Sequence, residues 1–248
     1  LPELIFAGAR VHVGGDEAYK GFWDQHWKDQ ALMKREGLDN TKELQSYFEK
    51  KLEKLIISKG KKMIGWDEIL EGGLAPEATV MSWRGMQGGI EASKLGHHVI
   101  MTPDDNCYLN EYQGDSVVEP PSKGTLRLST CYEFEPVPDG VDSKFILGGQ
   151  GNLWTEFVPN ERHAEYMTWP RALALAEVFW SQKDTRNWPG FIHRMEAQLP
   201  RFDAAHIKYA RSFYQAIITP VKDNMVNDSM RIQLGTEIPG PDIYYTFD

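Results

Sequence analysis

The chain lacks several features that would place it in a special class of protein. It has two cysteines in 248 residues, Cys107 and Cys131, and their spacing is not that of metal ligands. We therefore expect free thiols or at most one disulfide. No apolar run is long enough for a transmembrane helix, and residues 1–3 do not open a signal peptide. The length is sufficient to bury a large core.

Basic residues are also in the minority. The chain carries 27 Lys and Arg against 36 Asp and Glu, a formal net charge of −9. A charge of this sign argues against a nucleic acid or an anionic membrane surface as the partner. Aromatic residues, in contrast, are plentiful, with eight Trp and ten Tyr. Aromatic rings stack on the apolar faces of sugars, but they also fill protein cores, so composition alone leaves both uses open.

Short β-type runs alternate with helical patterns, which predicts an α/β fold with a parallel sheet wrapped in helices. The expected strands are residues 10–14, 62–66, 79–83, 98–101 and 145–149. The expected helices are residues 41–59, 88–95, 162–179 and 188–216, the last in one or two pieces. Pro170 should break or kink the third helix.

The helix at residues 41–59 has the clearest signals. Asn40 and Glu43 form an N-terminal capping pair, and Gly60 ends the helix. Apolar residues at helical spacing predict one buried stripe, made of Leu44, Phe48, Leu52, Leu55 and Ile56.

The C-terminal part has a different texture. After Pro220 the sequence loses helical periodicity and is rich in Gly, Pro, Asn and β-forming residues. We expect residues 1–220 to form one unit, and residues 221–248 to be a linker with the first strands of a β domain. The chain lacks an initiating Met and ends within an expected strand at residues 243–248, so we expect both ends to be cut points in a longer protein.

Residues 12–17 (His-Val-Gly-Gly-Asp-Glu) place two acids where the first strand ends. Neighbouring carboxyls can hold different protonation states, because like charges raise the pKa of one of them. One protonated acid beside one ionised acid is what glycosidic bond cleavage uses, and glycines let backbone and substrate approach closely. The residues alone leave an alternative, in which Asp16 caps the next helix and Glu17 faces water.

The other expected strands end in similar clusters. They are residues 65–68 (Gly-Trp-Asp-Glu), 82–85 (Ser-Trp-Arg-Gly), 107–110 (Cys-Tyr-Leu-Asn) and 152–156 (Asn-Leu-Trp-Thr-Glu). In barrels of parallel strands, catalytic groups gather at the carboxyl ends of the strands. Aromatic side chains repeated beside acids or amides at these ends therefore predict a sugar pocket.

Together, these five clusters resemble the second half of the catalytic barrel of glycoside hydrolase family 20, the β-N-acetylhexosaminidases. The resemblance runs from about residue 6 to residue 220, and residues 238–248 resemble the small β-sandwich that often follows the barrel in bacterial members. It implies a (β/α)8 TIM barrel, of which this chain supplies the last five strands. The first three strands, with a substrate-clamping Arg, would lie in a separate chain or elsewhere in the same protein. We expect the isolated chain to be inactive without them.

The resemblance implies substrate-assisted catalysis, in which the acetamido oxygen of the sugar attacks the anomeric carbon. Asp16 would accept a hydrogen bond from the acetamido N–H, and Glu17 would be the general acid and then the base. Tyr108 would donate its hydroxyl to the acetamido oxygen. His12 would support the acid pair from within the barrel, and Asp67 would have a supporting role. Between Asp67 and Glu68 it stays open which supports the site and which caps a helix.

The resemblance also implies the sugar contacts. Trp66, Trp83 and Trp154 would wall the sugar and its acetamido group, although each could instead be barrel packing. Glu156 would bind outer hydroxyls, its alternative being the first turn of a helix. Asn110 stands where the family usually has an acid, which should alter sugar preference or affinity more than the chemical step.

The sequence therefore predicts an exo-acting β-N-acetylhexosaminidase that removes terminal N-acetylglucosamine or N-acetylgalactosamine from glycans, without a cofactor. Bacterial members are usually exported, so we expect a periplasmic, cell-surface or secreted protein. One alternative is a truncated, non-catalytic sugar-binding fragment of such an enzyme. Another is a metal-dependent barrel hydrolase using His12, Asp16 and His97 or His98, for which no ligand spacing is found.

Overall fold

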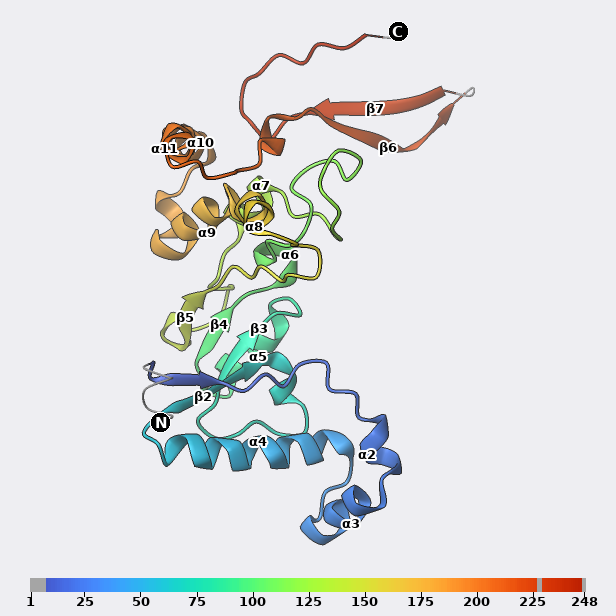
Figure 1. Ribbon diagram of the computed structural model, residues 1–248, viewed down its shortest axis with the longest axis vertical. Coiled ribbons are helices and arrows are strands. Elements are labelled where there is room, and N and C mark those ends of the chain that lie inside the picture. The colour runs from blue at the N-terminus through green and yellow to red at the C-terminus, as the bar shows by residue number, and fades with distance from the viewer. Residues whose placement is uncertain (1–7, 227–228, 247–248) are drawn as a thin grey trace. The chain divides into compact units, whose positions relative to one another are not determined.

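The computed structural model describes residues 8–226 and 229–246. The chain divides into two compact units (Figure 1). The first comprises the described residues up to Asp104 together with Pro136–Gln150, and the second comprises Asp105–Glu135 with the described residues from Gly151 onward. Among the described residues, no helix has both the length and the apolar character needed to cross a membrane.

The first unit contains a five-stranded sheet in which neighbouring strands are parallel and follow chain order. Its strands are β1 (Arg10–His12), β2 (Lys62–Trp66), β3 (Thr79–Ser82), β4 (Val99–Met101) and β5 (Ile146–Gly149). The five predicted strands are therefore confirmed, with ends that differ by a residue or two. β1 and β5 form the two edges of the sheet.

The two faces of the sheet bury different side chains. Ile64, Trp66 and Met81 form a cluster on one face, with Trp83 packed against it. The other face lies against helix α5 (Gln87–Lys94), where a Cβ added to Gly89 would come 2.5 Å from Met101 and 3.0 Å from Val99. One face is thus covered by helices, and the other carries Trp66, the last residue of β2, and Trp83, which follows β3.

Helix α4 spans Thr41–Ile57, as predicted, and lies alongside the sheet in Figure 1. Asn40 caps it, because its side chain accepts hydrogen bonds from the N–H groups of Lys42 and Glu43. The Glu43 carboxylate accepts the N–H of Asp39, one residue before the position a capping box would use. The helix ends two residues before the predicted Lys59.

The predicted buried stripe of α4 is confirmed at Leu44 and wrong at Phe48 and Leu55, while Leu52 and Ile56 are half-buried. Phe48 and Leu55 are each 59% exposed in the described chain, whereas Gln45 and Glu53 are buried. The helix packs against loops that present backbone polar groups. Gln45 Nε2 donates to the carbonyl of Gly15 at 2.8 Å, and Glu53 accepts a backbone N–H from the loop before β3. Buried backbone groups need partners, so the buried residues of α4 are mostly polar, with Leu44 the apolar exception.

The remaining helices of the first unit are short. Helices α2 (Gly21–Gln25) and α3 (Trp27–Glu36) follow the acid pair and were not predicted. The 3-10 turn η1 (Asp67–Leu70) follows β2, and the 3-10 turn η2 (Ser143–Phe145) precedes β5. Helix α6 (Asp104–Cys107) leads into the second unit.

The second unit is built from helices. These are α7 (Leu128–Glu133), α8 (Glu161–Thr168), α9 (Arg171–Trp180), α10 (Trp188–Glu196) and α11 (Leu199–Ala204), with 3-10 turns η3 (Lys183–Thr185) and η4 (Ser212–Tyr214). Pro170 separates α8 from α9, which confirms the predicted break. The free, buried state of Cys107 and Cys131 confirms the expectation of free thiols.

The helix expected at residues 188–216 is wrong beyond Ala204. Ala210 N–H donates to the carbonyl of Trp169, and Lys208 N–H donates to the Glu165 carboxylate. These groups bond to the α8–α9 region instead of to a helix of their own, so the chain runs without a regular helix there.

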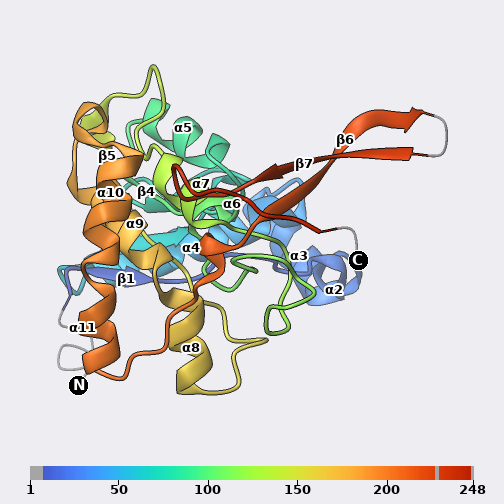
Figure 2. The ribbon, with the colours of Figure 1, turned by 90° about the horizontal axis from the view of Figure 1, so that it is seen from above.

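The second unit ends in a hairpin of β6 (Ile217–Val226) and β7 (Ser229–Gly235), which projects away from the unit's helices in both views (Figure 1, Figure 2). The first strand starts before the expected boundary at residue 221. The strand expected from residue 243 is absent at residues 243–246, and residues 247–248 lie outside the described chain.

Candidate active site

The acid pair follows β1 on a corner that is tied to β2. Val13 N–H donates to the carbonyl of Ile64, and the carbonyl of Gly14 accepts the N–H of Trp66, both at 2.9 Å. The chain then turns through Gly14 and Gly15, whose φ angles are +76° and +105°. Asp16 and Glu17 come next, and both are exposed.

Gly15 is required by its conformation and by a close neighbour. A Cβ at this position would lie 2.7 Å from Cγ2 of Ile69 in η1. Glu17 also has a positive φ of 49°, which is uncommon for a residue other than glycine. The corner that carries the acids is therefore sterically defined by η1, and sparsely populated backbone conformations are typical of functional sites.

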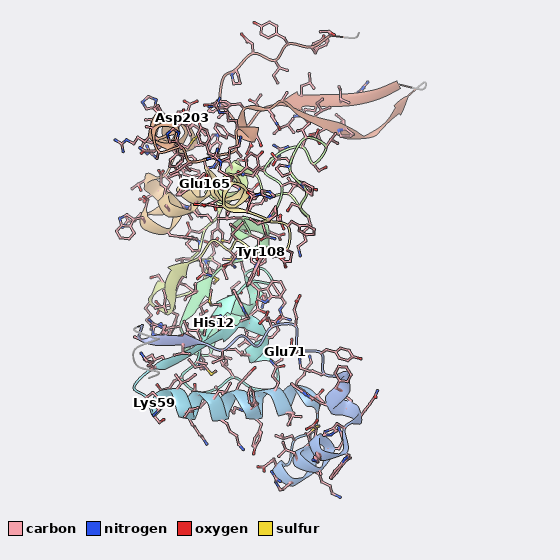
Figure 3. The ribbon with its side chains drawn as sticks, viewed as in Figure 1. His12, Lys59, Glu71, Tyr108, Glu165 and Asp203 are labelled. Carbon is pink, nitrogen blue, oxygen red and sulfur yellow. The ribbon has the colours of Figure 1, made fainter. Side chains whose placement is uncertain are left out.

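His12 lies between the acid pair and Trp66. His12 is labelled in Figure 3. Its Nδ1 accepts the N–H of Gly14 at 3.0 Å, and its ring meets the Trp66 ring edge-on at 4.9 Å between centroids. Partial burial lowers the pKa of His12, while the nearby negative charge of Asp16 raises it to a smaller extent. The neutral ring accepts at Nδ1 and so carries its proton on Nε2.

Asp67 and Glu68 both contact the cluster that follows β3. The buried Asp67 carboxylate accepts the backbone N–H of Trp83 at 3.0 Å and that of Arg84 at 3.1 Å, and it also pairs with Arg84 Nε at 2.6 Å. Glu68 Oε2 accepts the indole N–H of Trp83 at 2.9 Å. Neither side chain caps η1. Both acids therefore organise residues 83–84.

The pKa of Glu68 is raised. Burial is the main cause, and the hydrogen bond from Trp83 and the charge of Arg84 oppose it. The nearest Arg84 nitrogen lies 3.7 Å from Oε1 of Glu68, beyond normal hydrogen-bond distance. The carboxyl thus lies in an environment that disfavours its charged form.

Tyr108 and Trp154 are brought together in the second unit. Leu109 N–H donates to the carbonyl of Asn152 at 2.6 Å, and Asn152 N–H donates to the carbonyl of Cys107 at 2.8 Å. This pairing of two loops places the ring of Tyr108, which is labelled in Figure 3, edge-on to the Trp154 ring, 6.1 Å apart between centroids.

Asn110 and Glu156 differ in exposure. Glu156 is exposed, whereas Asn110 is 2% exposed and its Oδ1 has no hydrogen-bond partner among the described residues. A buried amide oxygen without a partner is rare in folded proteins. Its role as a sugar contact stays a prediction.

Arg171 supports this region and was missed by the sequence analysis. Its guanidinium is fully buried and donates to backbone carbonyls, among them those of Leu109 at 2.6 Å and Glu111 at 3.0 Å, on either side of Asn110. Burial lowers the pKa of Arg171 to about 10. The available signal was that Arg171 is the one cation of α9, in which every other residue except Glu177 is apolar.

The predicted site residues thus fall into two groups. His12, Asp16, Glu17, Trp66, Asp67 and Trp83 belong to the first unit, and Tyr108, Asn110, Trp154 and Glu156 belong to the second. Within each group the structure shows the contacts given above.

Histidines do not gather into a metal centre in the described part of the chain. His97 Nδ1 lies 2.9 Å from the carbonyl of Ala78, and His98 packs beside the Phe145 ring. No three His, Cys, Asp or Glu side chains among the described residues come together as a candidate metal site.

Comparison with known proteins identifies related sequences. The profile of "Glycosyl hydrolase family 20, catalytic domain" matches residues 3–183. A beta-hexosaminidase of Porphyromonas gingivalis is 43% identical over 83% of this chain and 27% of its own length. One of Vibrio furnissii is 36% identical over 69% of this chain and 29% of its own length. The chain therefore spans less than a third of these relatives.

Solved structures show the same relation. The exo β-N-acetylglucosaminidase of Vibrio harveyi, solved with N-acetylglucosamine, superposes with a TM-score of 0.79 at 31% identity. The match covers 86% of this chain and 34% of that chain. A β-N-acetylhexosaminidase of Bacteroides fragilis gives a TM-score of 0.74 at 25% identity, over 84% of this chain.

Proposed function

The chain belongs to glycosyl hydrolase family 20, and we propose that the protein is an exo-β-N-acetylhexosaminidase acting on terminal β-linked N-acetylglucosamine or N-acetylgalactosamine of glycans. The fold is that of part of the family's TIM barrel. The observation that carries the proposal is the Asp16–Glu17 pair at the carboxyl end of β1, beside His12 and Trp66. Catalytic groups of barrels gather at this end.

In the proposed mechanism the substrate supplies the nucleophile. The acetamido oxygen attacks the anomeric carbon as the bond to the leaving oxygen breaks, and Glu17 gives its proton to that oxygen. Asp16 accepts the acetamido N–H and stabilises the positive charge of the oxazolinium ion, while Tyr108 donates to the acetamido oxygen. Water then adds to the anomeric carbon as the bond from that carbon to the acetamido oxygen breaks, and the water gives its proton to Glu17. Because the anomeric carbon is inverted twice, the product retains its configuration.

The proposal also assigns the sugar contacts. Trp66, Trp83 and Trp154 wall the pyranose and its acetamido group, because apolar ring faces pair with apolar sugar faces. Asn110 and Glu156 bind hydroxyl groups. The unpaired buried oxygen of Asn110 supports its role as a hydroxyl acceptor.

We also propose that three further barrel strands complete the sheet. Parallel sheets are normally covered on both faces, and a closed barrel has no edges. Here β1 and β5 are edges, and α4 exposes Phe48 and Leu55. The completing segment would supply the substrate-clamping Arg. We further propose that the protein is exported, which agrees with a substrate that consists of the terminal sugars of glycans.

The function is tested by Glu17→Gln and Asp16→Asn in the full-length protein. Loss of the general acid should lower kcat for a p-nitrophenyl N-acetylglucosaminide about 10²–10⁴-fold. The loss should shrink for a dinitrophenyl leaving group, which needs less protonation. Asp16→Asn should lower kcat on the order of 10²-fold, with no relief from the better leaving group, because it impairs formation of the oxazolinium.

The control for both variants is Asp24→Asn on α2, an exposed acid a few residues away, which should leave both substrates unaffected. Equal and mild losses from Asp16→Asn and Glu17→Gln would contradict the proposed roles.

The alternative of a non-catalytic sugar binder is favoured by Asn110, which replaces the family's usual acid. The two functions are separated by affinity for a thiazoline that mimics the oxazolinium. An enzyme should bind it far more tightly than N-acetylglucosamine, since catalytic sites prefer transition-state-like ligands. Equal affinities would favour the binder.

A further inference from the structure

We propose that Glu68 is a positioning residue, whose carboxylate holds the indole of Trp83 by its N–H and thereby fixes one wall of the acetamido pocket. The proposal rests on the function given above, in which Trp83 walls that pocket. It assigns Glu68 a specific task among the two acids that follow β2.

The two ends of Trp83 are held by neighbouring residues of one turn. β2 and β3 are adjacent, with Trp66 paired to Met81, so η1 lies beside the residues that follow β3. Asp67 accepts the backbone N–H of Trp83 at 3.0 Å, and Glu68 accepts its indole N–H at 2.9 Å. The indole has one donor and no acceptor, so rotation to another rotamer would break this bond.

Arg84 does not account for the presence of Glu68. Arg84 Nε lies 2.6 Å from Asp67, and its Nη1 lies 3.2 Å from Glu71 (labelled in Figure 3), whereas Glu68 is 3.7 Å away. The Glu68 side chain is only 7% exposed. A carboxyl at this position has a cost of burial, which raises its pKa. The charge-assisted hydrogen bond from the indole N–H opposes this cost more strongly than the charge of Arg84 does, and offsets part of it.

The test is a double-mutant cycle in the full-length protein with Glu68→Leu, Glu68→Gln and Trp83→Phe. Loss of a hydrogen bond to a charged group should lower kcat/KM about ten- to hundredfold in Glu68→Leu, mainly through kcat. Glu68→Gln keeps an acceptor oxygen, so it should restore most of the activity. In the Trp83→Phe background, which has no indole N–H, Glu68→Leu should have little further effect.

A second readout is independent of turnover. The indole N–H resonance of Trp83, assigned by its loss in Trp83→Phe, should move upfield in ¹H–¹⁵N spectra of Glu68→Leu. Glu71→Gln is the matched control, because it removes an acid that pairs with Arg84 but does not contact Trp83. It should leave both the resonance and kcat unchanged.

The outcomes separate the two proposals. Additive losses in the cycle, or equal losses from Glu68→Gln and Glu68→Leu, would overturn the positioning role while the enzyme remains active. A protein that shows the expected NMR shift but hydrolyses no N-acetylglucosaminide supports the Glu68–Trp83 contact and refutes the proposed function.

Discussion

Single side chains hold this site mainly through bonds to the backbone. Asp67 accepts two backbone N–H groups beyond β3, and Arg171 donates to the carbonyls on both sides of Asn110. The sequence could identify the candidate Asp16, Glu17 and the tryptophans, because motifs and strand ends are local. It could not identify these partners, since Arg171 lies 62 residues from Leu109 along the chain.

The raised pKa of Glu68 gives a prediction for stability against pH. The folded state binds this proton more tightly than the unfolded state, so stability falls as pH rises from the ordinary value of about 4.3 through the raised pKa. Glu68→Gln removes this effect. Its thermal midpoint relative to the unmodified protein should therefore increase from pH 4 to pH 8, as followed by scanning calorimetry.

Glu71→Gln should show the opposite sign. Burial raises the pKa of Glu71, but hydrogen bonds from Lys42 and Arg84 outweigh it and the net pKa is lowered. The unmodified protein therefore becomes more stable as pH rises from the lowered pKa of Glu71 to the ordinary pKa of a glutamate. The Gln variant lacks this gain in stability. Parallel curves for Glu68→Gln and Glu71→Gln would contradict the assignment.

At the scale of elements, the strands and the α4 cap could be predicted because their signals are local. Short apolar runs that contain β-branched residues, such as Val99 and Ile100, mark the strands, and Asn40 caps the helix that follows it. The buried face of α4 could not be predicted from apolar spacing, because that face bonds to loop backbone at Gly15 and before β3. The predicted C-terminal end of the last helix was wrong for a similar reason, because the N–H of Ala210 donates to the carbonyl of Trp169 and not to a carbonyl within a helix.

The corner between β1 and the acid pair should not tolerate a side chain at Gly15. Gly15→Ala would force a Cβ to 2.7 Å from Ile69 Cγ2 at a φ of +105°. We expect a loss on the order of 1–3 kcal/mol for the overpacking, in addition to backbone strain, and lower kcat because the acid pair moves. Chemical denaturation and the aryl-glycoside assay measure the two effects.

Gly60→Ala is the control for backbone strain alone, because Gly60 has a φ of +69° with nothing within 4 Å of an added Cβ. It should cost about 1–2 kcal/mol and leave kcat unchanged. Ile69 is fully buried, so Ile69→Ala lowers stability by itself, but Gly15→Ala should cost less in the Ile69→Ala background than in the unmodified protein. Equal costs for Gly15→Ala and Gly60→Ala would show that contact with Ile69 does not define the corner.

At the scale of the whole molecule, the fold class could be predicted from the alternation of strands and helices and from the strand-end clusters, and the family match confirms it. The count of five strands also followed from the sequence. The sequence does not show how the sheet edges are covered, because the residues that we propose to cover them are not among these 248 residues. The exposed side chains Phe48 and Leu55 of α4 are the structural sign of this.

The open sheet predicts how the 248-residue chain behaves when it is expressed by itself. Exposed edge strands and apolar faces promote association, so we expect aggregation and rapid limited proteolysis, and no hydrolysis of the aryl glycoside. Phe48→Glu with Leu55→Lys should reduce this association, as measured by light scattering.

In the full-length protein the same pair of substitutions should lower stability, because there we expect that face of α4 to be covered. Lys54→Glu, an exposed polar site on α4, should change neither. A compact, protease-resistant monomer from the unmodified chain would refute the need for further strands.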